Sequence, residues 1–148
     1  MSMLVDVSYF ISGPRQIRNA TTAKMPTAEG LSANNVIYGY IRSFQRKFLN
    51  DVVGFTLAGQ ITDYLEIIEN ESPKTENDTV SPYEYVCRQL RESFADYVFY
   101  HILRDMNTDA TVTGLIQLKS SNKHVSPLQR QVSTWNTICL LYTSDAAD

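Results

Sequence analysis

The chain has 148 residues, of which 43% are hydrophobic and 20% charged, and a formal net charge of −3 at pH 7. This size and composition suit one soluble domain with a core of its own, and exclude a disordered chain or a scaffold that depends on disulfides or metal. No apolar run of about eighteen residues and no secretory leader occurs, so we expect no contact with a membrane.

Residues 1–30 are expected to form an extended arm. Leu4–Ile11 is a candidate strand, and the polar stretch behind it is interrupted by Gly13-Pro14, Pro26 and Gly30. The arm should therefore contribute little core of its own.

Apolar residues at helical spacing then predict two helices separated by Gly54. The first begins at an N-cap on Ser32, and the second begins at Thr56. The expected buried side chains are Ile37, Ile41, Phe44, Phe48 and Val52 in the first helix and Leu57, Ile61, Leu65 and Ile68 in the second. The polar stretch that follows, residues 70–80, is typical of an exposed loop.

Ser81-Pro82-Tyr83-Glu84 is a capping box with proline at the first helical position, which predicts a long helix to about Met106. The helix has a wide apolar surface, which is typical of a central helix. Its expected buried side chains include Val86, Leu90, Phe94, Tyr97 and Ile102.

Thr111–Leu118 is rich in β-branched residues, and Ser121-Asn122 is typical of a turn, which together indicate a small hairpin or an extended loop. Ser126-Pro127 opens a last helix with Leu128, Val132, Trp135 and Ile138 on its buried face. The predicted fold is therefore mainly α: a small bundle of about four helices, with an N-terminal extended arm and a short β-hairpin or loop before the last helix.

The last ten residues can be read as translated adapter DNA. Cys139–Asp148 is encoded by TGTCTCTTATACACATCTGACGCTGCCGAC, which resembles a transposase-based sequencing adapter. We therefore expect residues 139–148 not to be native, the helical domain to occupy residues 31–138, and the native protein, from a metagenome, to continue past Ile138.

The sequence contains no recognisable catalytic or metal-binding pattern. His101 and His124 belong to no metal-ligand motif, and Cys87 on a helix is typical of a small core residue. We expect neither an enzyme nor a cofactor, and assign no catalytic, metal-binding or cofactor-binding residue.

Charge is unevenly distributed along the chain. Residues 1–50 hold six Lys/Arg and two Asp/Glu (+4), residues 51–110 hold four and twelve (−8), and residues 111–138 hold three and none (+3). The surplus charges could balance one another within one fold or between neighbouring copies in a ring. The candidate subunit-interface residues are Arg42, Arg46 and Lys47 on the basic side and Asp63, Glu66 and Glu69 on the acidic side.

The order of elements resembles that of helical head-to-tail connector proteins of tailed bacteriophages and prophages, over roughly residues 4–138. The resemblance rests on short segments: Val52-Val53-Gly54, Tyr64-Leu65, Phe94-Ala95-Asp96-Tyr97-Val98-Phe99-Tyr100, Thr113-Gly114-Leu115 and Trp135-Asn136.

This resemblance implies a structural virion protein of the phage neck, made in the bacterial host cytoplasm. Such proteins form rings, commonly of twelve copies, between the portal protein and the next neck or tail protein, and DNA only passes through the channel. The candidate portal or neck contacts on this chain are Leu115, Gln117, Lys119, Lys123 and His124.

Two other functions stay open on the residues alone. A small helical regulatory or DNA-binding protein of a mobile element could use Arg42, Arg46 and Lys47, although the domain lacks the strongly basic surface of a duplex binder. An enzyme whose site lies beyond Ile138 is the other alternative.

Overall fold

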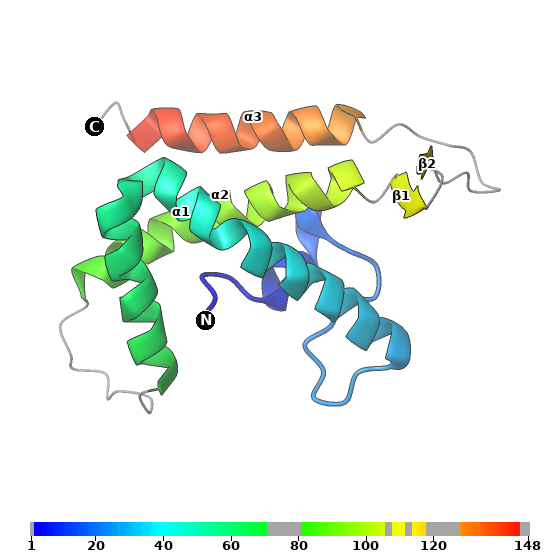
Figure 1. Ribbon diagram of the computed structural model, residues 1–148, viewed down its shortest axis with the longest axis horizontal. Helices are drawn as coiled ribbons and strands as arrows, with labels where there is room; N and C mark the ends of the chain where they lie inside the picture. Colours follow the sequence, from blue (N-terminus) through cyan, green and yellow to red (C-terminus); the bar gives the residue numbers. More distant parts are fainter. Residues whose placement is uncertain (1, 71–80, 106–107, 112–113, 118–127, 146–148) are drawn as a thin grey trace. The chain divides into compact units, whose positions relative to one another are not determined.

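The computed structural model describes residues 2–70, 81–105, 108–111, 114–117 and 128–145 (Figure 1), and its side chains at 2–70, 81–105 and 128–140. The described part is mainly α, as predicted, and includes two short 3-10 turns and one pair of strands. The chain divides into two compact units, Met1–Ala95 and Asp96–Asp148, which are described separately.

The N-terminal segment forms 3-10 turns, η1 (Val7–Phe10) and η2 (Gly13–Arg15), so the strand predicted over Leu4–Ile11 is wrong. Asp6 caps η1 by accepting a hydrogen bond from the Ser8 amide at 2.8 Å. Neighbouring side chains of a strand point to opposite faces, whereas here the consecutive residues Leu4 and Val5 are both buried. Turns bring such neighbours into one core.

The N-terminal segment contributes side chains to the core of the first unit. Leu4, Val5, Val7 and Phe10 are all buried. The buried Gln45 side chain holds this segment through its backbone: Gln45 Oε1 accepts from the Leu4 amide at 2.8 Å, and Gln45 Nε2 donates to the Ser2 carbonyl at 2.9 Å. Both ends of the buried amide are thus paired.

The first long helix, α1 (Ala28–Asn70), begins four residues before the predicted N-cap at Ser32. Thr27 is the cap instead, since its Oγ1 accepts from the Gly30 amide at 3.2 Å. Gly30 lies close to the preceding loop, where a Cβ would come within 3.0 Å of the Thr21 side chain. This close packing favours glycine at the start of α1.

Gly54 divides α1 into two halves, as the sequence predicted. Its backbone has φ 81° and ψ 163°, a conformation that side chains with a Cβ rarely adopt. The two halves of α1 change direction at this point in Figure 1. Together with α2 and α3, they make four helical segments among the described residues.

The helix α2 (Pro82–Asp105) begins where the capping box predicts. The part of α2 that belongs to the first unit packs on the first half of α1. There the rings of Phe48 and Phe94 are 4.9 Å apart. The buried apolar side chains of this core include Ile37, Ile41, Leu49, Ala58, Ile61, Leu65, Cys87 and Leu90.

The second unit includes the strands β1 (Thr108–Thr111) and β2 (Gly114–Gln117), which pair antiparallel with Thr108 opposite Gln117. The sequence predicts a small hairpin or an extended loop in this region, and the described strands form an antiparallel pair that begins three residues before Thr111. Residues 118–127, including the turn predicted at Ser121-Asn122 and the Ser126-Pro127 cap, lie outside the described residues.

The last helix, α3 (Leu128–Asp145), buries Ile138 as predicted, but the other three side chains of the predicted buried face are exposed. Leu128 is 61% exposed and Trp135 45% exposed, whereas Ile138 is 2% exposed and Thr134 is also buried. The Thr134 hydroxyl donates to the Arg130 carbonyl at 2.8 Å, which satisfies its polar group inside the helix. Burying Thr134 therefore costs little.

Contacts within the second unit pair α3 with the end of α2. The Arg130 guanidinium lies 4.9 Å from the centre of the Phe99 ring, and the rings of Tyr100 and Trp135 are 5.3 Å apart. Cation–π and aromatic contacts of this kind tolerate partial exposure. They explain how exposed aromatic residues still contribute to this unit.

Candidate functional site

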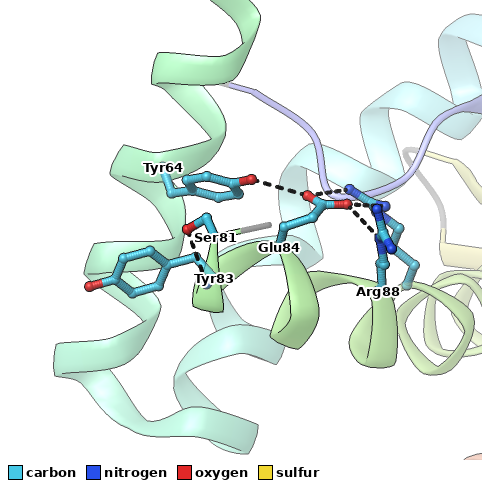
Figure 2. A network of polar contacts seen from close by, with 6 residues as sticks. Tyr64, Ser81, Tyr83, Glu84 and Arg88 are labelled. Atoms are coloured by element: carbon cyan, nitrogen blue, oxygen red, sulfur yellow. Dashed lines mark hydrogen bonds and ion pairs between the residues drawn. The ribbon is translucent and has the colours of Figure 1, made fainter. Parts of the chain in front are cut away.

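The strongest polar cluster in the first unit surrounds the Glu84 carboxylate (Figure 2). Tyr64 Oη donates to Glu84 Oε2 at 3.3 Å, and Arg88 Nε donates to Oε1 at 3.2 Å. Arg91 binds both oxygens, with Nη1 3.0 Å from Oε1 and Nη2 3.3 Å from Oε2. Three side chains therefore converge on one carboxylate.

Helix geometry explains most of this cluster. Arg88 and Arg91 follow Glu84 by four and seven residues, so all three lie on one face of α2. Tyr64 comes from the second half of α1, and its ring is 5.8 Å from that of Tyr83. The cluster thus joins two helices that are separated in sequence by residues 71–80.

The predicted capping box forms only in part. The Ser81 hydroxyl accepts from the Tyr83 amide at 3.3 Å, as a cap should, but the Glu84 carboxylate binds Tyr64, Arg88 and Arg91 rather than returning to the Ser81 amide. The charge-assisted bonds to two guanidinium groups are stronger than one bond to a backbone amide. Contacts along α2, together with the hydrogen bond from Tyr64, therefore replace the second half of the local motif.

The electrostatics fix the protonation states of the cluster. Burial by itself raises the pKa of Glu84, but the hydrogen bonds and charge of Arg91, with smaller contributions from Arg88 and Tyr64, outweigh burial and bring this pKa below its ordinary value. Burial, followed by the neighbouring Glu84 charge, raises the pKa of Tyr64. Glu84 stays ionised and Tyr64 stays protonated at neutral pH.

An open cleft of about 700 Å³ lies beside the cluster, lined by the N-terminal segment, the second half of α1 and the start of α2. Its lining includes Asp6, Tyr9, Ile68 and Glu69. A general acid or base needs a pKa near the working pH and a vacant position for substrate. The pKa of Glu84 is lowered away from neutral pH, so its carboxylate serves here as the centre of ion pairs within α2, and the hydrogen bond from Tyr64 clamps α1 to α2.

Cys87 and His101 behave as packed helix residues. Cys87 is fully buried, and burial raises the pKa of its thiol, which keeps it protonated and unreactive. His101 is buried too, with its ring 4.6 Å from that of Tyr97 and 5.4 Å from that of Tyr100. Among the described residues, no group of three His, Cys, Asp or Glu side chains could hold a metal ion.

The six predicted subunit-interface residues all lie on the surface of α1. Arg42, Arg46 and Lys47 are exposed on its first half, and the exposed acids Asp63, Glu66 and Glu69 are on its second half. Lys47 also forms an ion pair with Asp51 one turn further along the same helix. The Gly54 kink thus separates a basic surface from an acidic one.

A second, smaller groove of about 390 Å³ lies at the kink of α1. It brings one predicted basic residue, Arg46, and one predicted acidic residue, Glu66, to the same hollow, together with the exposed side chain of Phe55. Helical spacing alone did not indicate this groove, because it depends on the angle between the two halves of α1.

The predicted portal contacts are described only in part. Leu115 and Gln117 belong to the backbone of β2, and the position of their side chains is not described. Lys119, Lys123 and His124 lie outside the described residues.

Comparison of the chain with family models, with curated proteins and with solved structures finds no match. In the described part of the chain, no helix combines the length and the apolar character needed to cross a membrane.

Proposed function

We propose that this protein is a structural subunit of a ring that joins the portal of a tailed bacteriophage to its tail and lines the DNA exit channel. The resemblance to helical connector proteins and the mainly helical fold support this role. The observation that carries it is the separation of charge along α1, with exposed basic residues before Gly54 and exposed acids after it.

The ring forms through a contact between unlike surfaces of neighbouring copies. The basic surface of one copy (Arg42, Arg46 and Lys47) faces the acidic surface of the next copy (Asp63, Glu66 and Glu69). Such a heterologous contact closes into a ring when the rotation per copy divides a full turn. Complementary charge favours the correct neighbour and opposes stacking of like surfaces.

The subunit has no catalytic step in this role. It binds the portal on one side and the next neck or tail protein on the other, and DNA passes through the ring. The Glu84 cluster serves the role indirectly, because the hydrogen bond from Tyr64 to Glu84 ties the second half of α1, and so the acidic surface, to α2.

Ring assembly on purified portal protein tests the proposal, with particle shape followed by electron microscopy and mass by light scattering. The double variant Arg42→Glu with Arg46→Glu should lose ring assembly and keep its helical circular dichroism. The matched control is Arg18→Glu with Lys24→Glu, which changes the net charge equally at exposed positions outside α1. Rings formed equally well by both double variants would contradict the proposal.

The DNA-binding alternative gives a different result in the same preparation. Binding of the isolated chain to duplex DNA that weakens steeply with salt, without assembly on the portal, would favour a regulatory protein.

Sequencing the source locus past the codon for Ile138, with a library that adds no transposon ends, should show portal, capsid and tail genes beside it if the protein is a connector.

A further inference from the structure

The groove at the kink of α1 has an apolar floor and no unsatisfied hydroxyl. Leu49 and Ala58 form buried parts of its lining, one from each half of the helix. The hydroxyl of Thr62, which also lines the groove, donates to the Ala58 carbonyl at 2.8 Å. An apolar side chain could therefore enter the groove over this floor without leaving the Thr62 hydroxyl unpaired.

Gly59 lies in this lining, and nothing in the described part of its own chain requires a glycine there. A Cβ built on Gly59 would meet no atom within 4 Å, and its φ is not in the left-handed region. Glycine destabilises the interior of a helix relative to alanine. A close approach by a second molecule would explain why this position is left open.

Phe55 lies beside the same groove and is 80% exposed. Burying an exposed phenylalanine side chain is favourable because it removes apolar surface from water. One surface of the chain thus carries both a protruding aromatic side chain and an apolar hollow.

The charges at the groove identify the partner as a second copy of this chain. Arg46 lies on the first half of α1 and Glu66 on the second, with the groove between them. We infer that two copies pair about a two-fold axis through this groove, with Phe55 of each copy inserted beside Gly59 of the other. The two-fold axis places Arg46 of each copy next to Glu66 of its partner, so the surface is complementary to itself.

This pairing does not depend on the proposed ring. A two-fold contact closes at two copies, whereas a ring needs a contact between unlike surfaces. Arg46 and Glu66 belong to both contacts, so the pair must separate before these residues can join a ring. The need for the pair to separate rests on the proposed function, whereas the pairing itself does not.

The test compares two glycines of α1 that differ only in their position. Gly59→Leu fills the groove, and Gly39→Leu adds the same side chain at an exposed position where a Cβ also meets nothing within 4 Å. Sedimentation equilibrium should give the mass of a dimer for the wild-type chain and for Gly39→Leu, and the mass of a monomer for Gly59→Leu. Circular dichroism checks that both variants keep their helices.

A charge exchange tests the two-fold geometry. Arg46→Glu alone and Glu66→Arg alone should each weaken pairing, because like charges then meet across the axis. An equimolar mixture of the two variants should restore dimers that contain one copy of each. Phe55→Ser should lose pairing in every mixture.

A wild-type chain that stays monomeric, or equal dimerisation of Gly59→Leu and Gly39→Leu, would overturn the inference. Failure of the mixture to restore dimers would overturn the two-fold arrangement. Gly59 is not among the six residues proposed for the ring contact. A Gly59→Leu chain that is monomeric alone but forms rings on the portal would therefore support both proposals. Loss of rings in the Arg42→Glu chain would bear on the ring contact and not on the pair.

Discussion

At the scale of single residues, the surroundings of a side chain decide its role more than its place in a local motif. Glu84 occupies the third helical position of a capping box, yet its carboxylate binds Tyr64, Arg88 and Arg91. Gln45 is a polar residue on an otherwise apolar stripe, yet it is buried because the backbone of Ser2 and Leu4 satisfies its amide. Both side chains thus link segments that are separated in the sequence.

Replacing Glu84 by glutamine should lower the free energy of unfolding. The change removes the negative charge while Arg91 and Tyr64 remain partly buried beside it, and loss of a charged hydrogen-bond partner costs about 1–3 kcal/mol. Urea denaturation measures the difference. Arg88→Ala is the control, since Arg88 is largely exposed and an exposed ion pair contributes roughly 1 kcal/mol or less. An equal effect of both variants would contradict the proposed clamp.

The same carboxylate should make stability depend on pH. The pKa of Glu84 is lower in the folded chain than its ordinary value of 4.5, so the stabilisation is fully present above 4.5 and is lost as the pH falls through the lower, folded pKa. The difference in free energy of unfolding between wild type and Glu84→Gln should therefore be constant near neutral pH and shrink in acid. A difference that grew in acid would contradict the sign of the shift.

At the scale of elements, α1 shows how one residue divides a helix. Apolar spacing runs on both sides of Gly54, and only the positive φ of this glycine separates the two stripes. The N-terminal segment shows the opposite case. Its short apolar run was read as a strand, but without a partner strand among the described residues it folds into turns that place Val7 and Phe10 in the core.

Gly54→Ala should destabilise the chain, because the left-handed region costs an L-residue about 1–2 kcal/mol. Gly39→Ala is the matched control. It lies inside the same helix with open space around its Cβ, and should raise stability by up to about 1 kcal/mol. Thermal denaturation should thus shift in opposite directions for the two variants, and a shared direction would show that the kink is not fixed by Gly54.

Gln45→Ala should release the N-terminal segment before the rest of the first unit unfolds. The Leu4 amide and the Ser2 carbonyl would lose their partners, and two buried backbone groups would be left unsatisfied. Hydrogen exchange at the Leu4 amide should become faster, with a smaller effect in the Phe94 region. Gln60→Ala, at an exposed position of α1, should change neither, and unaltered protection of Leu4 in Gln45→Ala would refute this anchoring role.

At the scale of the whole molecule, function depends on surfaces that a single copy leaves exposed. The basic and acidic surfaces of α1 are candidates for a ring contact, and the groove between Arg46 and Glu66 is a candidate for a pair. These two contacts differ in their chemistry, since the first is mainly charged and the second buries Phe55.

Salt should therefore separate the two contacts. Raising the ionic strength from physiological to about 1 M shortens the screening length from about 8 Å to about 3 Å, which weakens attraction between exposed charges. Rings on the portal should dissociate, whereas the pair should persist because apolar burial is not screened. Light scattering across a salt series checks both, and a pair that dissociates at lower salt than the ring would contradict the role given to Phe55.

The sequence alone determined the helical class, the break at Gly54, the start of α2 and most of the buried stripe of α1, because these depend on local periodicity and on glycine and proline geometry. Only the tertiary structure decided the features that need distant partners: the buried N-terminal turns, the inward face of α3, the contact of Tyr64 with Glu84 and the kink groove. The physical reason is the distance along the chain over which each interaction acts. Backbone preferences act over a few residues, whereas burial and ion pairing depend on which segments meet in space.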